Sequence, residues 1–324
     1  MKRIAAFAAV LLGAAVLAAP VHADNYPSRR VTIFVPYPAG GPTDQVARIV
    51  ADRLSKTFKQ TFIVEDLPGG GTILATNKVA HAAPDGYTLL LHNIQISANV
   101  SLYKKLSFDT EKDLTPVMII NHNALVIAGR KDLPPDNLKQ LLAYMNTHDT
   151  TFAIPGYGTA GHLVASLFVR EVKHPVTLVP YRGGAPALVD TLGGHVDLFI
   201  GTPQAVVAHA KRGELKIYGY TGTEKSAQFP KAANLVKALG PKYDIGFWEG
   251  LFAPAGTSKA IVARLNAAME DMLHDPAVLK IWARQGVTPM PKSMRSPAAG
   301  RKYVKQQIAF WAKVIHDNNI HLQP

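Results

Sequence analysis

The sequence of 324 residues contains no cysteine. This absence excludes a disulfide framework, thiolate metal sites, a cysteine nucleophile and a lipid-modified N-terminal cysteine. No block of sequence recurs at a fixed spacing, which argues against a solenoid built from repeats. Beyond residue 19, no apolar stretch has the length and the lack of charge that a bilayer-spanning helix needs. The remaining possibility is a globular protein that is soluble once the N-terminus has been processed.

Motifs of several enzyme classes are also missing. There is no Gly-x-Ser-x-Gly nucleophile elbow, no His-Glu-x-x-His zinc helix and no EF-hand loop. Gly40 and Gly41 are not followed by the Lys-Ser or Lys-Thr of a nucleotide-binding P-loop. We therefore expect a protein that is not an enzyme and that uses no metal and no cofactor. An exported enzyme that acts on organic acids is the alternative in a different functional class.

The first 23 residues have the pattern of a cleaved export signal. Lys2 and Arg3 precede an apolar run at residues 4–19, and small residues stand at positions −3 and −1 of a cut after Ala23. The run is shorter than the ~20 residues of a transmembrane helix, and a proline follows it. The sequence therefore predicts that the mature protein is exported.

Positive charge exceeds negative charge. The chain has 35 Lys and Arg against 23 Asp and Glu, a net charge of +12, and loss of Lys2 and Arg3 with the signal leaves +10. Such a field attracts anions. The basic residues are scattered and not interleaved with aromatic residues, so nucleic acid is not an expected partner. A small anionic molecule or an anionic membrane surface is favoured, although a solvated basic surface explains much of the charge.

Length and a hydrophobic content of 48% predict two domains. Apolar, β-branched runs alternate with helical patterns, which is typical of an α/β fold with parallel strands. Strands are expected at 31–35, 62–65, 87–91, 125–128, 151–154, 176–179, 196–200, 215–220 and 247–253. Helices are expected at 44–58, 73–81, 137–145, 160–172, after Gly184, and at 203–211, 258–273, 276–284 and 296–317, with 222–243 irregular. If the strand at 247–253 returns to the first domain, lobe 1 comprises 24–124 and 248–324, lobe 2 comprises 125–247, and a ligand cleft separates them.

The strongest local motif is Pro36-Tyr37-Pro38-Ala39-Gly40-Gly41-Pro42-Thr43-Asp44. A strand ends, two glycines allow a ligand to approach the backbone closely, and a helix begins. The N-terminus of such a helix presents unpaired N–H groups and a partial positive charge, which suit a carboxylate or a phosphate. An ordinary tight turn between strand and helix is an equally acceptable interpretation of this stretch alone.

Two further loops in the second half also connect a strand to a helix. Residues 156–162, Gly-Tyr-Gly-Thr-Ala-Gly-His, contain the dinucleotide fingerprint, but Pro180-Tyr181-Arg182 stands where that fingerprint requires an acidic residue. We therefore expect a second anion loop there and no dinucleotide site. In the third loop, Tyr181-Arg182-Gly183-Gly184, the arginine either pairs with a carboxylate or stays exposed. Either a structural role or a place in the wall of the ligand site is possible for His162, Phe247 and Trp248.

Six motifs, taken together and in this order, carry a family resemblance: residues 37–44, Pro68-Gly69-Gly70-Gly71, Pro84-Asp85-Gly86-Tyr87-Thr88-Leu89-Leu90, Gly156-Tyr157-Gly158-Thr159 with His162, Tyr181-Arg182-Gly183-Gly184, and Gly250-Leu251-Phe252-Ala253-Pro254-Ala255-Gly256-Thr257. The mature chain resembles throughout the Bug-type (TctC-like) periplasmic substrate-binding proteins of tripartite tricarboxylate transporters. The resemblance implies a two-lobed Venus-flytrap fold, a periplasmic location, a small carboxylate ligand, transient docking to a membrane transporter and a monomeric state.

By this resemblance, the first loop and the Gly-x-Gly-Thr loop meet one ligand carboxylate through backbone groups and waters, and variable segments contact the rest of the ligand. Those segments are 93–97, Tyr157, 202–203 and 247–248, whose aromatic residues make an aromatic dicarboxylate such as terephthalate conceivable. The expected ligand-binding residues are Tyr37, Ala39, Gly40, Gly41, Thr43, Asp44, Gln95, Gly158, Thr159, His162, Arg182, Gly183, Thr202 and Phe247.

The sequence departs from the family pattern at Asp66 and at residues 69–72, which we expect behind the helices of lobe 1. These departures therefore concern packing more than binding. A sensor whose loaded form docks to a histidine kinase is a further alternative to a transport receptor.

Overall fold

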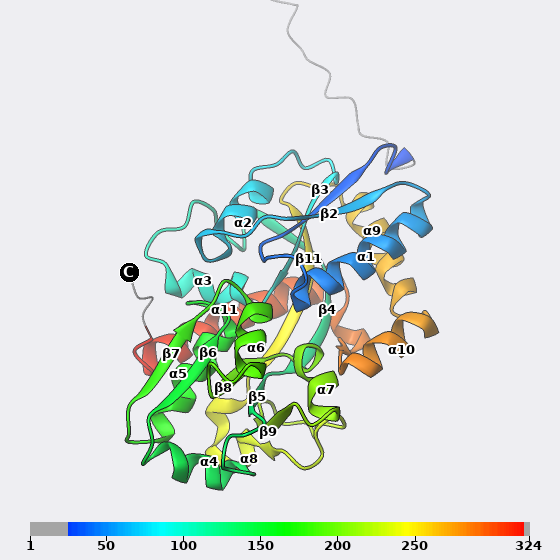
Figure 1. Cartoon of the computed structure of the whole chain (residues 1–324). Helices are drawn as coiled ribbons and strands as arrows, with labels where there is room; N and C mark the ends of the chain where they lie inside the picture. Colours follow the sequence, from blue (N-terminus) through cyan, green and yellow to red (C-terminus); the bar gives the residue numbers. More distant parts are fainter. Residues whose placement is uncertain (1–24, 321–324) are drawn as a thin grey trace, which may run out of the picture.

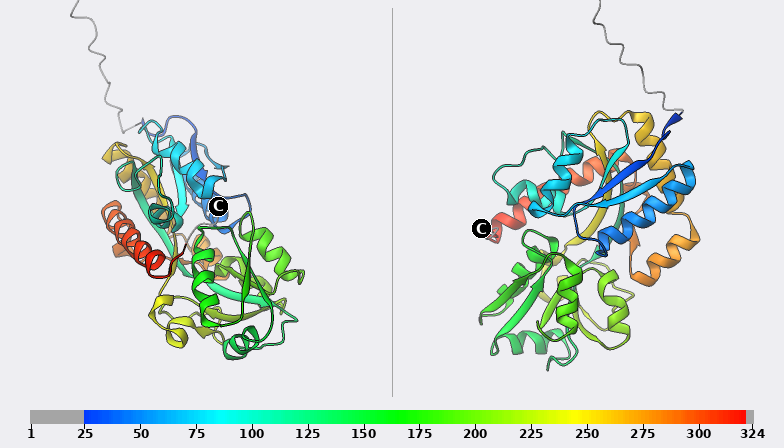
Figure 2. Two further views of the ribbon diagram at one scale, coloured as in Figure 1. Left: turned by 90° about the vertical axis from the view of Figure 1, so that its left-hand side faces the viewer. Right: turned by 45° about the horizontal axis from the view of Figure 1, so that its top comes forward.

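The computed structural model describes residues 25–320 and contains two mixed β-sheets of six strands each. Helices cover both sheets, so the molecule consists of two α/β lobes, one above the other in Figure 1 and in both views of Figure 2. The predicted α/β fold is confirmed. The predicted signal peptide lies outside the described residues. Within residues 25–320, no helix combines the length and the apolarity that crossing a membrane requires.

The first sheet has the strand order β12-β4-β11-β3-β1-β2, in which β1 is parallel to β2 and β3, whereas β11 is antiparallel to β3 and β4. Its strands are β1 (Val31–Val35), β2 (Phe62–Asp66), β3 (Thr88–Asn93), β4 (Leu114–Ala124), β11 (Gly246–Pro254) and β12 (Thr288–Pro289). The helices of this part of the chain are α1 (Pro42–Phe58), α2 (Ile73–Ala80), α3 (Gln95–Leu102), α9 (Lys259–Met272), α10 (Pro276–Gln285) and α11 (Pro297–Asp317), with short 3-10 turns at Gly70–Thr72 and Lys292–Met294.

Both faces of the first sheet are buried. On one face, Ile33 of β1 belongs to the same apolar cluster as Val50 of α1 and Leu265 of α9. On the other face, Leu90 of β3 belongs to a cluster that includes Trp311 of α11. Because helices cover both faces, the strands appear in the sequence as almost continuous apolar runs.

The second sheet has the strand order β10-β9-β5-β8-β6-β7, with β6 parallel to β7 and β8, and β5 antiparallel to β8 and β9. Its strands are β5 (Val126–Arg130), β6 (Thr150–Ile154), β7 (Val176–Pro180), β8 (Leu198–Gly201), β9 (Leu215–Tyr220) and β10 (Ala233–Asn234). Its helices are α4 (Leu138–Met145), α5 (Ala160–Phe168), α6 (Gly184–Leu192), α7 (Pro203–Lys211) and α8 (Leu235–Leu239), with 3-10 turns at Val169–Glu171 and Pro241–Tyr243. Since β6, β7 and β8 run in one direction, α5, α6 and α7 all begin at the same edge of the sheet.

The chain passes from one sheet to the other at two adjacent points. β4 ends at Ala124 and β5 begins at Val126, while β11 begins at Gly246, which pairs with Ala124. The buried Thr221 joins the two crossing segments, because its hydroxyl donates to the carbonyl of Ile245 (2.6 Å) and accepts from the N–H of Leu125 (2.8 Å). The two connections therefore lie side by side.

Several expected elements differ from the observed ones. The segment at 93–97 is not a variable loop, because Asn93 ends β3 and Gln95 begins α3. The long strand β4 was not among the expected strands, and the expected irregular segment at 222–243 contains β10 and α8. The expected helix at 160–172 ends as an α-helix at Phe168 and continues as a 3-10 turn. The helix expected at 44–58 begins two residues earlier, with Pro42 in its first turn, where a missing N–H costs nothing.

Candidate ligand-binding site

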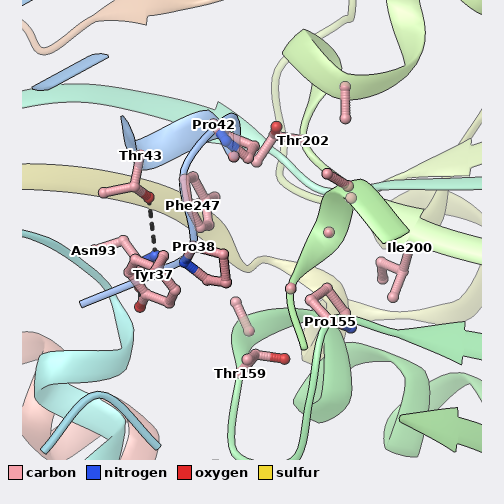
Figure 3. Close-up of a pocket in the computed structure, with 18 of the residues that line it drawn as sticks. Tyr37, Pro38, Pro42, Thr43, Asn93, Pro155, Thr159, Ile200, Thr202 and Phe247 are labelled. Carbon is pink, nitrogen blue, oxygen red and sulfur yellow. Dashed lines mark hydrogen bonds between the residues drawn. The ribbon is translucent and has the colours of Figure 1, made fainter. Parts of the chain in front are cut away.

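A pocket lies between the two lobes, and residues of both lobes line it (Figure 3). The first-sheet lobe contributes the loop after β1, the start of α1 and positions on or after β3 and β11: Tyr37, Pro38, Ala39, Gly41, Pro42, Thr43, Asn93, Gln95 and Phe247. The second-sheet lobe contributes mainly the starts of α5, α6 and α7: Leu125, Pro155, Thr159, Ala160, Gly161, Arg182, Gly183, Gly184, Ala185, Pro186, Phe199, Ile200, Gly201, Thr202 and Ala205. In Figure 3, Pro38 and Phe247 face Pro155 and Ile200 across the pocket.

The helices α1, α5, α6 and α7 begin at this pocket, and Gln95, the first residue of α3, also lines it. The N-cap residues of α1, α6 and α7 are Gly41, Gly183 and Thr202, and none of them forms a side-chain capping hydrogen bond. The first N–H groups of a helix have no partner within the helix, and the helix dipole makes this end positive. The pocket is therefore suited to an anion.

The side chains at the pocket are mostly apolar. Arg182 is the only charged residue among those that line it, and large parts of the wall are formed by Pro38, Pro155, Ile200 and Phe247. Within residues 25–320, no group of three or more His, Asp and Glu residues is placed to hold a metal ion. An anionic ligand would thus be held by main-chain N–H groups and one guanidinium, while its carbon skeleton would contact apolar side chains.

Asp44 fixes the shape of the first loop from behind. Its side chain is buried, and its Oδ2 accepts the N–H of Gly40 at 2.8 Å. Gly40 has a φ of +82°, a conformation that favours glycine. Arg48, one helical turn further on, donates from Nε to the same carboxylate. Asp44 therefore orders the loop, and neither Asp44 nor Gly40 lines the pocket.

A hydrogen-bonded network connects the first loop to the end of β3. The Tyr37 hydroxyl donates to Oδ1 of Asn93 (2.6 Å), and Nδ2 of Asn93 donates to Oγ1 of Thr43 (3.2 Å), the contact drawn in Figure 3. The N–H of Gln95 donates to the same Asn93 oxygen (3.1 Å). Burial raises the pKa of Tyr37 well above its usual value, so the phenol stays neutral. This network makes one wall of the pocket rigid.

The second loop is ordered by Thr159 and His162. The Thr159 hydroxyl donates to the carbonyl of Gly156 (2.7 Å) and accepts the N–H of His162 (3.2 Å), so it caps α5. The N–H of Gly158 donates to Nδ1 of His162 (3.1 Å), and burial lowers the pKa of this imidazole to about 4. His162 is therefore neutral at pH 7 and supports the loop from outside the pocket wall.

Thr202 is the N-cap residue of α7 and is 3% exposed. Within the described part of the chain its Oγ1 has no hydrogen-bond partner. Thr202 is among the residues that line the pocket, and Figure 3 shows its side chain beside Pro42 of the other lobe. Because buried hydroxyl groups almost always have a partner, this oxygen is available to a ligand or an ordered water.

Comparison with known proteins identifies the family. Residues 46–320 match the model of the tripartite tricarboxylate transporter family receptor. The chain belongs to this family. It is 31% identical to the protein BugT of Bordetella pertussis over 327 aligned residues, which cover 100% of this chain and 99% of BugT. The predicted resemblance to Bug-type, TctC-like periplasmic solute-binding proteins is thus confirmed.

Two solved structures of Rhodopseudomonas palustris proteins have the same fold. MatC with bound malate has a TM-score of 0.84 and 34% identity, covering 90% of this chain and 100% of MatC. Rpa4515 with adipate has a TM-score of 0.85 and 29% identity, covering 91% of this chain and 99% of that protein. Malate and adipate, the ligands of these two proteins, are both small dicarboxylates, and the predicted two-lobed binding-protein fold is confirmed.

The structure brings most of the predicted binding residues of this receptor together. Those that line the pocket are Tyr37, Ala39, Gly41, Thr43, Gln95, Thr159, Arg182, Gly183, Thr202 and Phe247. Those that do not line it are Gly40, Asp44, Gly158 and His162, which instead form or support the two loops. Trp248, next to Phe247, is fully buried in the core, and its Nε1 donates to Oε1 of Gln307.

Residues 69–72 do not lie behind the helices of the first lobe. Gly69, Gly71 and Thr72 line a second cavity with Tyr157 and Arg182 of the other lobe, next to the pocket. The glycine-rich segment turns toward the other lobe because Gly69, Gly70 and Gly71 all have positive φ. Gln95 and Asn99 then donate through their side-chain amides to the carbonyl of Gly71 (3.3 and 2.9 Å).

Sequence reasoning missed Glu249, which lies in β11 directly behind the pocket wall. It is fully buried, and its Oε2 accepts Nδ2 of Asn121 at 2.7 Å. Burial raises its pKa to about 7, while the hydrogen bond from Asn121 acts in the opposite direction, and its Oε1 has no hydrogen-bond partner. The sequence does mark this residue as unusual, because Glu249 is the one charged residue in the otherwise apolar run at 247–253.

Proposed function

We propose that this receptor is a periplasmic solute-binding protein that captures a small organic carboxylate and delivers it to a tripartite tricarboxylate transporter. The observation that carries the proposal is that the N-termini of α1, α5, α6 and α7, from both lobes, converge on one pocket among whose lining residues Arg182 is the charged one. Such a pocket favours anions through its backbone. The malate and adipate bound to the two related receptors support the same class of ligand.

The helix N-termini at the pocket favour a ligand with an acceptor group at each end. The N-termini of α5 and α7, marked by Thr159 and Thr202, lie at the lower and upper ends of the pocket in Figure 3, and the apolar side chains of Pro155 and Ile200 line the wall beside them. A dicarboxylate with an apolar middle would match this order. Phe247 and Tyr37 in the wall also favour an aromatic dicarboxylate such as terephthalate as a candidate. A tricarboxylate would use Arg182 for the additional charge.

In this proposal the ligand is bound and released without chemical change. His162, the imidazole nearest the second loop, is neutral and uses Nδ1 to accept the Gly158 N–H. Asp44 accepts from Gly40 and pairs with Arg48. Neither group is left to act as a general base. An enzyme acting on organic acids would consume the ligand, which separates the two functions experimentally.

The remaining parts of the proposal concern the whole chain. Export through the signal at residues 1–23 would leave a monomer with lobe 1 at 24–124 and 248–324 and lobe 2 at 125–247. The crossing at Ala124 agrees with the first of these boundaries, and the crossing at Gly246 lies within two residues of the second, because Gly246 and Phe247 already pair with β4 of the first sheet. The loaded receptor would dock transiently to the transporter. Docking to a histidine kinase instead would make the same receptor a sensor.

A thermal-shift screen of the mature protein against malate, adipate, citrate and terephthalate tests the proposed function. A ligand that binds only the folded state raises stability by RT ln(1 + [L]/Kd), about 2.7 kcal/mol at a hundredfold excess over Kd. We expect at least one carboxylate to raise Tm, and chromatography to recover it unchanged. No shift with any of them would contradict the carboxylate proposal, whereas a changed ligand would indicate an enzyme.

A further inference from the structure

Glu249 has no role in the proposed function, although it lies behind the pocket. In the sheet it pairs with Asn93 of β3 and with Asn121 of β4, so these three side chains project from the same face. The same face carries α1, whose first turn contains Thr43. Asn93 and Thr43 both line the pocket. One layer of side chains therefore separates the Glu249 carboxyl group from the ligand.

The surroundings of Glu249 contain no compensating cation. Within residues 25–320, Glu249 forms no ion pair. Its Oε2 accepts from the Asn121 amide, and its Oε1 is buried without a hydrogen-bond partner. The other titratable groups nearby are already neutral or paired. The Tyr37 phenol is neutral, Asp44 of α1 is paired with Arg48, and His92, which projects from the other face of β3, is kept neutral by burial. A charge on Glu249 is therefore uncompensated.

An anionic ligand in the pocket would add a second negative charge next to this buried carboxylate. Like charges in a medium of low dielectric repel strongly, and a neighbouring negative charge favours the protonated form of a carboxyl group. The repulsion disappears when one proton from solvent binds to Glu249. Building on the proposed function, we propose that Glu249 is a proton-binding site that fills when the carboxylate ligand binds, so that the receptor captures the ligand together with a proton.

Thr43 connects the proton to the ligand. The Thr43 oxygen accepts from Nδ2 of Asn93, so its own proton can turn toward the ionised Glu249, whose Oε1 has no partner. When Glu249 is protonated, it no longer attracts the Thr43 proton, which can then point into the pocket that Thr43 lines. Protonation therefore turns Thr43 from an acceptor into a donor for an anion. No other bond forms or breaks, and bulk water supplies the proton.

Calorimetry of the mature protein with adipate or malate, whichever raises Tm more, tests the proposal. At pH 8 the binding enthalpy is measured in HEPES and in Tris, whose ionisation enthalpies differ, and the difference gives the number of protons taken up. We expect uptake that approaches one proton per ligand. With a pKa near 7 in the free protein, Kd should rise about twofold from pH 6 to pH 7 and about fivefold from pH 7 to pH 8.

The variant Glu249→Gln should bind the same ligand with no proton uptake and with a Kd that does not change over this pH range. The matched control is Glu171→Gln in the second lobe, where Glu171 accepts from Tyr243 and pairs with Lys242. It should take up protons as the wild type does. Wild-type binding without proton uptake, or uptake that persists in Glu249→Gln, would overturn the proton site and leave the proposed function intact. Absence of binding by either carboxylate would instead count against the proposed function.

Discussion

Glu249 of β11 and His92 of the neighbouring β3 are both fully buried titratable side chains. Burial raises the pKa of Glu249 from 4.5 to about 7, so the folded state binds this proton more tightly than the unfolded chain. Stability must then fall as the pH rises from about 4.5 to 7. Burial lowers the pKa of His92 from 6.5 to about 3, so stability must also fall as the pH drops below 6.5. Because of these two side chains, the free energy of unfolding should be highest in weakly acidic solution.

We predict that Glu249→Gln gains stability relative to the wild type as the pH rises. The neutral amide has no charge to bury, whereas the wild type must ionise a buried carboxyl group. One pKa unit corresponds to about 1.4 kcal/mol, so the gain between pH 5 and pH 8 should be roughly 2–3 kcal/mol. Denaturant unfolding of both proteins at the two pH values measures it. An equal difference at pH 5 and pH 8 would contradict the raised pKa.

A second residue-scale prediction concerns Gly41, the N-cap of α1. Its φ of −73° is accessible to any residue, and a Cβ there would meet only the carbonyl oxygen of Pro38, at 3.4 Å. Gly41→Val should therefore leave the fold intact but fill the space in which a carboxylate approaches the backbone. We expect carboxylate binding to be abolished and the free energy of unfolding to change by less than about 1 kcal/mol. Calorimetry that finds unchanged affinity in the folded variant would refute the role of this loop.

Among the helices and loops, the start of α5 offers a test. Thr159 is the N-cap of α5 and also lines the pocket, so its substitution separates a capping role from a binding role. Its hydroxyl already donates to Gly156 and accepts from His162. We therefore predict that Thr159→Val destabilises the protein by about 1 kcal/mol through loss of the cap, with little change in Kd. Thr159→Ser keeps the hydroxyl and serves as the control. A loss of affinity of 1–3 kcal/mol at unchanged stability would instead mean that the hydroxyl holds the ligand.

An element could be predicted from the sequence when the residues that define it are close together in the chain. The loop at 156–162 and the start of α5 could be predicted, because the glycines, the cap Thr159 and the following apolar helix are adjacent in the sequence. The role of Glu249 could not, because its partner Asn121 is 128 residues away and only the pairing of β11 with β4 brings them together. Similarly, α3 has a weak apolar pattern, since its Gln95, Ser97 and Asn99 are buried polar residues.

On the scale of the whole molecule, the two lobes meet at the pocket. Pro38 of one lobe lies next to Gly183 of the other, with 3.6 Å between its ring carbons and the position that a Cβ at Gly183 would occupy. The two crossings, joined by Thr221, would serve as a hinge between lobes that each contribute part of the anion site. A ligand that contacts both lobes stabilises the closed arrangement relative to an open one.

We predict that the lobes close on the ligand. Small-angle scattering of the mature protein should give a smaller radius of gyration with a saturating carboxylate than without it. Gly41→Val, which should not bind, provides the control, and its radius should not respond to the same addition. An unchanged radius at proven saturation would mean that the site is preformed and that the hinge does not move.

The positive ends of α1, α5, α6 and α7 consist of main-chain N–H groups, which every residue except proline supplies. Substitutions at wall positions such as Pro155, Ile200 or Phe247 can therefore change the shape of the accepted ligand without removing the groups that attract its charge. In such a receptor, the side chains that select the shape of the ligand are different groups from the main-chain N–H groups that anchor its charge. A single substitution in the wall can thus change which organic acid fits, while the helix N-termini that attract its charge remain in place.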